Sequence, residues 1–187
     1  MRFLELESSK TAYRADFAVY GLAAASLAAT LWIHTPRPGW ALACTVLAGY
    51  LLWTLLEYGL HRFVLHGVQP FRAMHELHHR RPGAHIGTPT VVSAPLFALL
   101  VFAPAWRLAG PLWAGALTLG VLVGYLTYAF THHVCHHGPA RGAWSRRLRR
   151  WHASHHQRGA IPACYGVSHR LWDHLFGTAP RASGSPG

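Results

Sequence analysis

Four apolar stretches of this 187-residue chain are long enough, or nearly long enough, to cross a lipid bilayer. They cover residues 17–33, 40–58, 90–108 and 112–130. A membrane-spanning helix needs roughly 20 apolar residues. Since 51% of the residues are apolar and 12% are charged, the chain is predicted to be an all-α membrane protein with four transmembrane helices, rather than a soluble protein with buried core helices.

Two short connections rich in proline and glycine join these stretches in pairs. Residues 34–39 link the first stretch to the second, and residues 109–111 link the third to the fourth. Such connections are typical of helical hairpins, so both turns should lie on one side of the membrane. Of the 17 lysine and arginine residues, only Arg37 and Arg107 fall beside these turns. The positive-inside rule therefore predicts that both termini are cytosolic.

The rest of the chain fits one domain over residues 1–178, followed by a disordered tail over residues 179–187, which is rich in Pro, Gly and Ser. No cleavable signal peptide is expected, because residues 1–14 lack a short apolar core and a cleavage site. Three scattered cysteines argue against a disulfide framework and fit a reducing, cytosolic face. The arginines flank apolar stretches, so the net charge of +11 indicates contact with anionic lipid rather than nucleic acid.

Sixteen histidines occur in the chain, and ten of them fall into four spaced boxes. The boxes are His61-x4-His66, His75-x2-His78-His79, His132-x3-His136 and His152-x2-His155-His156. All four lie on the predicted cytosolic side, where they would form a His-rich helical cap. Neutral imidazole is a preferred ligand of Fe, Zn, Cu and Ni, so this pattern predicts a metal site.

The spacing within the boxes places most of these histidines on shared helical faces. His132 and His136 are four residues apart, and the second and fourth boxes have i, i+3, i+4 spacing, so the imidazoles of each box can converge. His61 and His66 are five residues apart, roughly 140° around an ideal α-helix. They therefore serve different metals, or the helix unwinds between them near Gly67. His133 and His137 point away from the ligand face and are left out.

Ten ligands exceed the four to six that one ion takes, so two metals are the natural number. The boxes carry no cysteine pairs of a structural zinc site. A centre of imidazoles at a membrane surface suits O₂-dependent chemistry on lipid chains, because breaking an unactivated C–H bond needs an O₂-activating metal. The alternative outside the enzymes is a His-rich membrane metal-binding protein or transporter. Transporters hold their ligands near the bilayer midplane, where these stretches carry no histidine.

From residue 57 to residue 178 the chain resembles the fatty acid hydroxylase / sterol desaturase superfamily of integral-membrane di-iron enzymes. The motifs that carry the resemblance are Glu57-Tyr-x-x-His61-Arg62-x3-His66, His75-x2-His78-His79, Thr131-His132-x3-His136-His137-Gly138, His152-x2-His155-His156 and Tyr165-Gly-Val-Ser168-x3-Trp172-Asp173-x2-Phe176-Gly177-Thr178. The third box and the closing segment look most like those of fatty acid 2-hydroxylases.

This resemblance implies an O₂-dependent hydroxylase of a lipid acyl chain, acting next to the carboxyl carbon. The ten box histidines would ligate two irons, which zinc could replace in a purified sample. Under the resemblance, Trp172 and Asp173 would support these ligands or have a structural role. In the alternative interpretation, Trp172 and Phe176 are anchors at the membrane interface and Asp173 pairs with an arginine. The alternative within the superfamily is a sterol or carotenoid hydroxylase or desaturase.

The resemblance also bears on where the substrate binds and on the source of electrons. The lipid head group would sit among arginines such as Arg62, Arg72 or Arg80. A separate donor protein, cytochrome b5-like or ferredoxin-like, would supply the electrons. It would dock on a run of arginines, whose alternative role is to contact lipid headgroups: Arg146, Arg147, Arg149 and Arg150. Where related hydroxylases often have Tyr-Asp before the third box, this chain has Tyr128-Ala129, so one carboxylate is missing. Apart from the resemblance, a small chain rich in Ala, Arg and Gly, with no signal peptide expected, indicates a bacterial inner membrane, and the endoplasmic reticulum is the alternative location.

Overall fold

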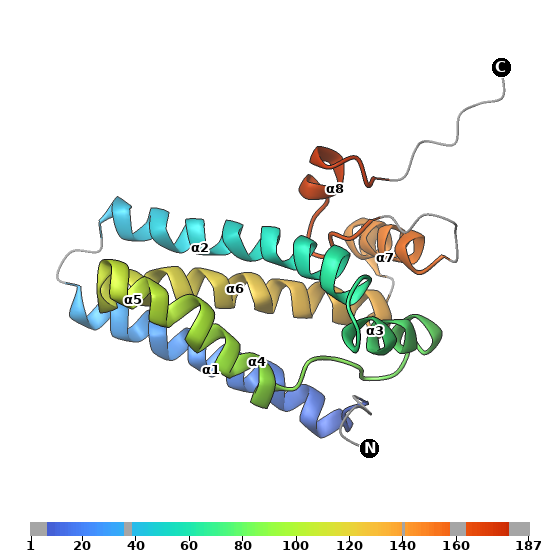
Figure 1. Cartoon of the computed structure of the whole chain (residues 1–187), viewed down its shortest axis with the longest axis horizontal. Helices are drawn as coiled ribbons and strands as arrows, with labels where there is room; N and C mark the ends of the chain where they lie inside the picture. The colour runs from blue at the N-terminus through green and yellow to red at the C-terminus, as the bar shows by residue number, and fades with distance from the viewer. Residues whose placement is uncertain (1–6, 36–38, 140, 158–163, 180–187) are drawn as a thin grey trace. The chain divides into compact units, whose positions relative to one another are not determined.

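The computed structural model describes residues 7–35, 39–139, 141–157 and 164–179 of the chain. Within these residues the structure is helical, and the only β-type pairing is an isolated bridge between Glu7 and Ile86. The prediction of an all-α fold is therefore confirmed (Figure 1). The predicted tail over residues 179–187 lies, apart from Ala179, outside the described residues.

The helices follow one another along the chain, and Figure 1 labels those named α1 to α8. They are α1 (Lys10–His34), α2 (Trp40–Gly59), the π-helix η2 (Leu60–Leu65), α3 (Phe71–Arg80), α4 (Thr90–Phe97), the π-helix η3 (Ala98–Phe102), α5 (Ala103–Ala109), α6 (Pro111–His136), α7 (Gly142–His156) and α8 (Leu171–Leu175).

Four helical segments are long and apolar enough to cross a membrane, as predicted: Lys10–His34, Trp40–Leu65, Thr90–Ala109 and Pro111–His136. Each contains one of the four ranges predicted from the sequence. The third segment changes its winding at η3, between Pro95 and Pro104. Proline has no N–H to give to the carbonyl four residues earlier, so the regular α-helical ladder is interrupted there.

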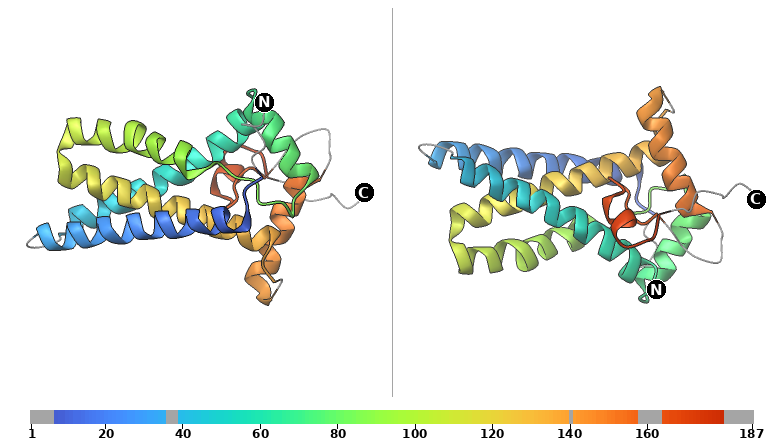
Figure 2. Two further views of the ribbon diagram at one scale, coloured as in Figure 1. Left: turned by 90° about the horizontal axis from the view of Figure 1, so that it is seen from below. Right: turned by 90° about the horizontal axis from the view of Figure 1, so that it is seen from above.

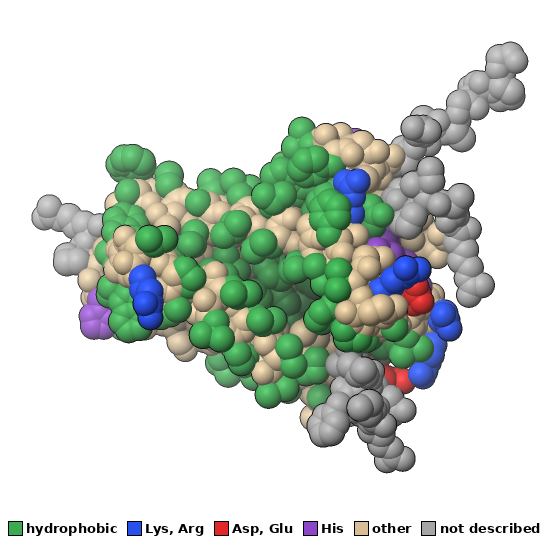
Figure 3. All heavy atoms as spheres, in the orientation of Figure 1, with side chains coloured by type: hydrophobic (Ala, Val, Ile, Leu, Met, Phe, Trp, Pro, Cys, Tyr) green, Lys and Arg blue, Asp and Glu red, His purple; other side chains and the backbone are tan. Residues whose placement is uncertain are grey.

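Large apolar side chains on these segments are exposed, as expected of surfaces that face lipid. Trp32, Val91, Leu100 and Leu108 are each between 69% and 87% accessible. Figure 3 shows hydrophobic side chains distributed along the visible face of the long helices. A soluble protein rarely exposes so large a continuous apolar area, because its contact with water is unfavourable.

The chain divides into two compact units. The first comprises Met1–Trp53 and Ala84–Ala129, and the second comprises Thr54–Gly83 and Phe130–Gly187. Helices α2 and α6 each begin in the first unit and end in the second. The expectation of one domain over residues 1–178, with two hairpins and a cytosolic cap, stays a prediction.

The first unit is held together by small and apolar side chains of α1, α2 and α6. Leu31, Leu42 and Ala116, one from each helix, form a buried cluster. Helices α2 and α6 approach very closely, since a Cβ added at Gly49 would lie 2.1 Å from the Leu117 carbonyl oxygen, and one at Gly120 would lie 2.0 Å from that of Val46. Small residues at such crossings are typical of packed membrane helices.

The second unit contains all four histidine boxes. It consists of the last turns of α2 with η2, helix α3, the last turns of α6, helices α7 and α8, and the segment between them. Figure 2 shows from two sides that the C-terminal ends of α3 and α7 meet, where the rings of His79 and His156 stack with centroids 4.3 Å apart.

Candidate metal centre

The ten box histidines come together in the second unit, where their Nε2 atoms converge. A first group draws on η2, α3 and α7 and contains His61, His66, His75, His79 and His155. A second group contains His78, His136, His152 and His156. Within each group, one ring nitrogen of every member lies within 4.8 Å of those of all the others.

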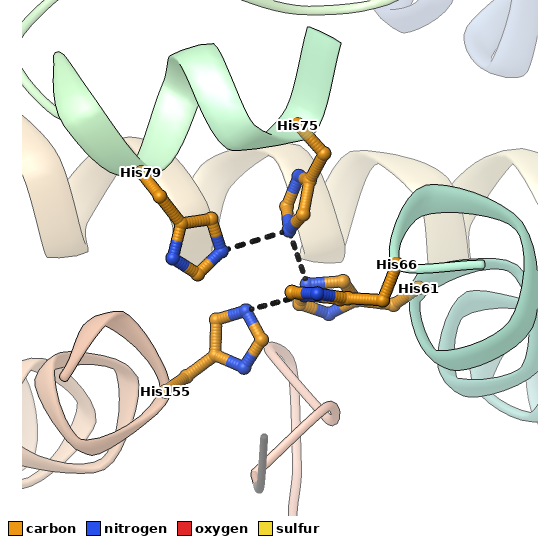
Figure 4. Close-up of side chains that lie close together, drawn as sticks. All are labelled: His61, His66, His75, His79 and His155. Atoms are coloured by element: carbon orange, nitrogen blue, oxygen red, sulfur yellow. Dashed lines mark hydrogen bonds between the residues drawn. The ribbon is translucent and has the colours of Figure 1, made fainter. Parts of the chain in front are cut away.

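The first group is built around His75 and His66 (Figure 4). The Nε2 atom of His75 lies 2.9 Å from that of His61 and 3.0 Å from that of His79. The Nε2 atoms of His66 and His155 are 3.2 Å apart. All five rings in Figure 4 therefore turn the same kind of nitrogen toward one small region.

The second group is built around His152. Its Nε2 atom lies 2.7 Å from that of His136 and 3.0 Å from that of His156. His132 adjoins this group, because its Nε2 atom is 3.2 Å from that of His78. The tenth predicted histidine thus lies beside the second group of four, next to His78.

These distances fit metal coordination. Two nitrogens bound to one ion at about 2.1 Å, with 90° between them, lie about 3.0 Å apart. In the second group, the Nδ1 atoms of His78, His152 and His156 are buried and have no hydrogen-bond partner among the described residues. The Nε2 atoms of these rings, by contrast, approach one another, which is the arrangement that several ligands of one ion require. Both groups contain only imidazoles, a donor set that suits iron or zinc.

The π-helix explains how His61 and His66 reach the same group. A π turn closes with a hydrogen bond from residue i+5 to residue i, and the amide of His66 donates to the carbonyl of His61 at 3.2 Å. Of the two alternatives that the sequence left open, the change in winding is observed, and it brings both histidines into the first group. The change lies at Leu60–Leu65, before Gly67. Which ion each of them binds stays a prediction.

The two boxes with three histidines each contribute to both groups. From α3, His75 and His79 enter the first group and His78 the second. From α7, His155 enters the first group, whereas His152 and His156 enter the second. The i, i+3, i+4 spacing predicted a shared face, but the rings diverge enough along that face to divide between two neighbouring centres.

Burial keeps the imidazoles outside the membrane-spanning segments neutral. Desolvation lowers the pKa of His78 and that of His156 to about 3, and it lowers that of His66 to about 4. Neighbouring histidines depress these pKa values further, since two close imidazolium charges repel each other. A neutral ring is the form that binds metal.

His133 and His137 belong to neither of the groups found among the described residues. Their rings lie near each other, with centroids 5.3 Å apart, and the ring of His137 lies 6.3 Å from that of His136. The ligand assignment of the other ten stays a prediction, which their convergence supports.

The closing segment supports the first group through a backbone carbonyl. The Nδ1 atom of His61 donates a hydrogen bond to the carbonyl oxygen of Tyr165 at 2.6 Å. This bond fixes the proton on Nδ1 and leaves the lone pair on Nε2, where a metal would bind. Asp173 is fully buried and accepts hydrogen bonds from the amides of Tyr165 and Gly166, each at 2.8 Å. Asp173 therefore holds this segment by accepting backbone hydrogen bonds.

Trp172 and Tyr58 attach the same segment to α2. Trp172 donates from Nε1 to the hydroxyl of Thr54 at 3.1 Å. Arg62 donates to the Tyr58 hydroxyl at 2.7 Å, and the Thr178 hydroxyl donates to Asp173 at 2.7 Å. The Tyr58 hydroxyl, 3.0 Å from that of Thr178, must then be the donor to it, because Thr178 has only one proton to give.

Two residues that the sequence did not assign to the site are Glu57 and Tyr165. Glu57 is buried, and its carboxylate accepts hydrogen bonds from the amides of Val167 and Ser168 at 2.7 and 2.9 Å and from the Ser168 hydroxyl. A glutamate in an apolar helix, one turn before His61, was the available signal, because such residues are rarely buried without partners. Tyr165 acts through its backbone, which no sequence pattern reveals.

Comparisons with known proteins agree with this geometry. The family model for fatty acid hydroxylase matches residues 46–178, which include all ten histidines. A dihydroceramide fatty acyl 2-hydroxylase of Arabidopsis thaliana is 36% identical over 143 residues, and a fatty acid 2-hydroxylase of Rattus norvegicus is 34% identical over 143 residues. These matches cover 71% and 70% of this chain but 59% and 38% of the two relatives.

A solved structure agrees as well. Full-length scs7p, of which only the hydroxylase domain is visible, matches with a TM-score of 0.77 and 25% identity, and the match covers 98% of this chain and 73% of that one. The match of the family model extends over the boxes and the closing segment that carried the resemblance. The chain therefore belongs to the fatty acid hydroxylase family.

Proposed function

We propose that the protein hydroxylates a lipid acyl chain at the second carbon, in a reaction that uses O₂ and two bound iron ions. One oxygen atom would enter the substrate and the other would leave as water. The observation that carries the proposal is the convergence of ten imidazoles in two adjoining groups, in a chain of this family. The names of the relatives point to the acyl chain and to carbon 2.

Each iron would have five of the histidines as its ligands. His61, His66, His75, His79 and His155 would hold one ion, and His78, His132, His136, His152 and His156 would hold the other. Bound iron would supply the redox chemistry with O₂ that side-chain acids and bases lack. Zinc binds the same donors but cannot change its oxidation state.

Arg62 is the candidate for binding the lipid head group. Its guanidinium lies 5.8 Å from the ring centre of Tyr165, and that ring lies 5.8 Å from the ring of His61 and 5.5 Å from that of His66. A carboxyl or amide head bound at Arg62 would leave the next carbons close to the first group. Arg72 and Arg80 are weaker candidates, because both form ion pairs with Glu76, at 2.9 and 3.7 Å.

The electrons would come from a separate donor protein that docks on α7. Arg146, Arg147 and Arg150 are exposed on this helix, whose buried side carries His152 and His155. An acidic donor would be attracted to such a surface. Arg149 is engaged differently, since it donates to the carbonyl of Gly138 at 2.7 Å. The donor class is cytochrome b5-like or ferredoxin-like, and the metal centre and both termini are proposed to face the cytosol of a bacterial cell.

Mass spectrometry of acyl lipids tests the proposal. The chain would be expressed with an electron donor, beside His78→Ala and beside His34→Ala, which alters an exposed histidine outside both groups. We expect acyl chains hydroxylated at carbon 2 with the unaltered chain and with His34→Ala, and none with His78→Ala. Oxidised sterols or carotenoids would favour the alternative substrates, and metal transport without any lipid change would favour a transporter.

A further inference from the structure

The segment before α8 is bound by two buried carboxylates through four consecutive amides. The amides of Tyr165 and Gly166 donate to Asp173, and those of Val167 and Ser168 donate to Glu57. Each carboxylate also accepts a hydroxyl proton, Asp173 from Thr178 and Glu57 from Ser168. Three donors directed at each carboxylate, and no acceptor, are the partners that an ionised group requires.

One peptide group in this segment lies between Asp173 and His61. The carbonyl of Tyr165 and the amide N–H of Gly166 belong to the same peptide group, and in a trans peptide they point in opposite directions. The carbonyl accepts from Nδ1 of His61 at 2.6 Å, while the N–H donates to Oδ2 of Asp173 at 2.8 Å. The order of groups is therefore carboxylate, peptide, imidazole, and then the Nε2 atom that faces the first group.

The position of Gly166 shows that this approach is close. A Cβ added there would lie 2.8 Å from Oδ2 of Asp173 and 2.1 Å from the carbonyl oxygen of His169. Any larger residue would push the carboxylate away from the peptide group. Asp173 itself has no accessible surface, so water does not weaken the contact.

We infer that Asp173 is a positioning residue that acts on His61 through the peptide group between Tyr165 and Gly166. Its negative charge polarises this peptide group, strengthens the hydrogen bond from His61 to the carbonyl, and makes Nε2 of His61 a better metal ligand. Histidine ligands commonly donate directly to a carboxylate; here a peptide group is interposed. The inference rests on the metal centre proposed above.

Glu57 provides the matched control. It is buried like Asp173, binds the same segment, and accepts the same number of hydrogen bonds. Its amide partners, however, belong to the two peptide groups that follow, neither of which accepts from His61. Glu57→Gln thus loosens the segment as Asp173→Asn does, but leaves the polarised peptide group intact.

The first measurement is a zinc titration of the purified full-length protein against a competing chelator. We expect Asp173→Asn to weaken the binding of at least one zinc ion about 10-fold or more, the usual effect of removing a group that hydrogen-bonds a ligand. Glu57→Gln should weaken it clearly less. Equal losses in the two variants, or no loss in Asp173→Asn, would overturn the inference. Failure of the unaltered protein to bind zinc would instead refute the metal centre itself.

The second measurement is proton NMR of the His61 Nδ1–H group in zinc-loaded protein with ¹⁵N-labelled histidine. A weaker hydrogen bond should move this resonance upfield in Asp173→Asn and leave it in place in Glu57→Gln. If Asp173→Asn does not fold, Thr178→Val serves instead. This variant removes the hydroxyl that donates to Asp173. The carboxylate should then polarise the peptide group more strongly, which should move the resonance downfield. An unchanged resonance in the folded variant would overturn the inference.

Discussion

The two nitrogens of each histidine ring have different surroundings in this centre. Nε2 atoms converge throughout, at separations between 2.7 and 3.2 Å. Nδ1 of His61 donates to a carbonyl, while Nδ1 of His78 and that of His152 are buried without a partner in the part of the chain that the structure describes. At the scale of single residues, a histidine should therefore be replaceable without loss of metal only if its Nε2 atom lies outside both groups.

His133 and His136 allow a direct test of this point. They are three residues apart on the same helix, but only His136 has its Nε2 atom in a group, 2.7 Å from that of His152. We expect His136→Ala to lower the metal content from about two ions per chain toward one and to abolish hydroxylation. His133→Ala should retain both the metal content and the hydroxylation activity. Metal analysis of the two purified variants would decide, and equal metal contents would contradict the assignment.

Acid should destabilise the metal-free protein. Burial lowers the pKa of His78 to about 3 in the folded chain, whereas the pKa of an unfolded histidine is about 6.5. Below pH 6.5 the unfolded chain therefore binds protons that the folded chain does not, and each such residue costs up to about 1.4 kcal/mol per pH unit. The unfolding temperature of the chelated protein in detergent should fall as the pH is lowered from 7 to 5; a constant or rising temperature would contradict this.

At the scale of elements, the π-helix η2 places His66 in the same group as His61. Its conformation brings Gly67 so close to the preceding turn that a Cβ there would lie 2.2 Å from the carbonyl oxygen of Phe63. Gly59, at the end of α2, has open space around its Cα. Gly59 and Gly67 flank η2, and there is room for a Cβ at Gly59 but not at Gly67.

Substitution of these glycines by alanine should have opposite effects. Gly67→Ala would force η2 to shift, which should cost about 1–3 kcal/mol of stability and weaken metal binding through His66. Gly59→Ala should leave metal binding unchanged and raise stability by about 0.4–1 kcal/mol, because alanine restricts the unfolded chain. Thermal unfolding and metal content would be measured for both. Metal binding in Gly67→Ala as tight as in Gly59→Ala would show that η2 can relax.

The elements also show how far the sequence could predict the site. The four spans and the shared faces of His75, His78 and His79 followed from local spacing, because apolar length and helical periodicity are local properties. The π turn did not, since the sequence allowed two readings of the pair His61 and His66. The contact of His61 with Tyr165 joins residues 104 positions apart. Such a contact depends on tertiary structure and has no local signal.

At the scale of the whole molecule, the distribution of charge predicts the orientation in the membrane. Of the 17 lysines and arginines, Arg37 and Arg107 lie near the far ends of the predicted spans, and the others lie with the histidines and termini. Positive charge favours the cytosolic side during insertion.

Reporter fusions at the C-terminus test this orientation. We expect a C-terminal green fluorescent protein to fluoresce and a C-terminal alkaline phosphatase to be inactive, because the first matures in the cytosol and the second only outside it. Active phosphatase would place the histidine groups on the opposite side and would exclude a cytosolic electron donor. A fusion after Arg37 should give the reverse result and serves as the control.

The all-imidazole composition of the two groups has a further consequence for the whole centre. Imidazoles carry no charge, so two divalent ions bound by them would keep their full positive charge in a poorly solvated place. Such a centre would attract anions strongly, including hydroxide and a substrate carboxylate, and would accept electrons more readily than one with acidic ligands. The carboxylate of Asp173, which binds the adjoining segment, would then offset part of that charge without occupying a coordination position.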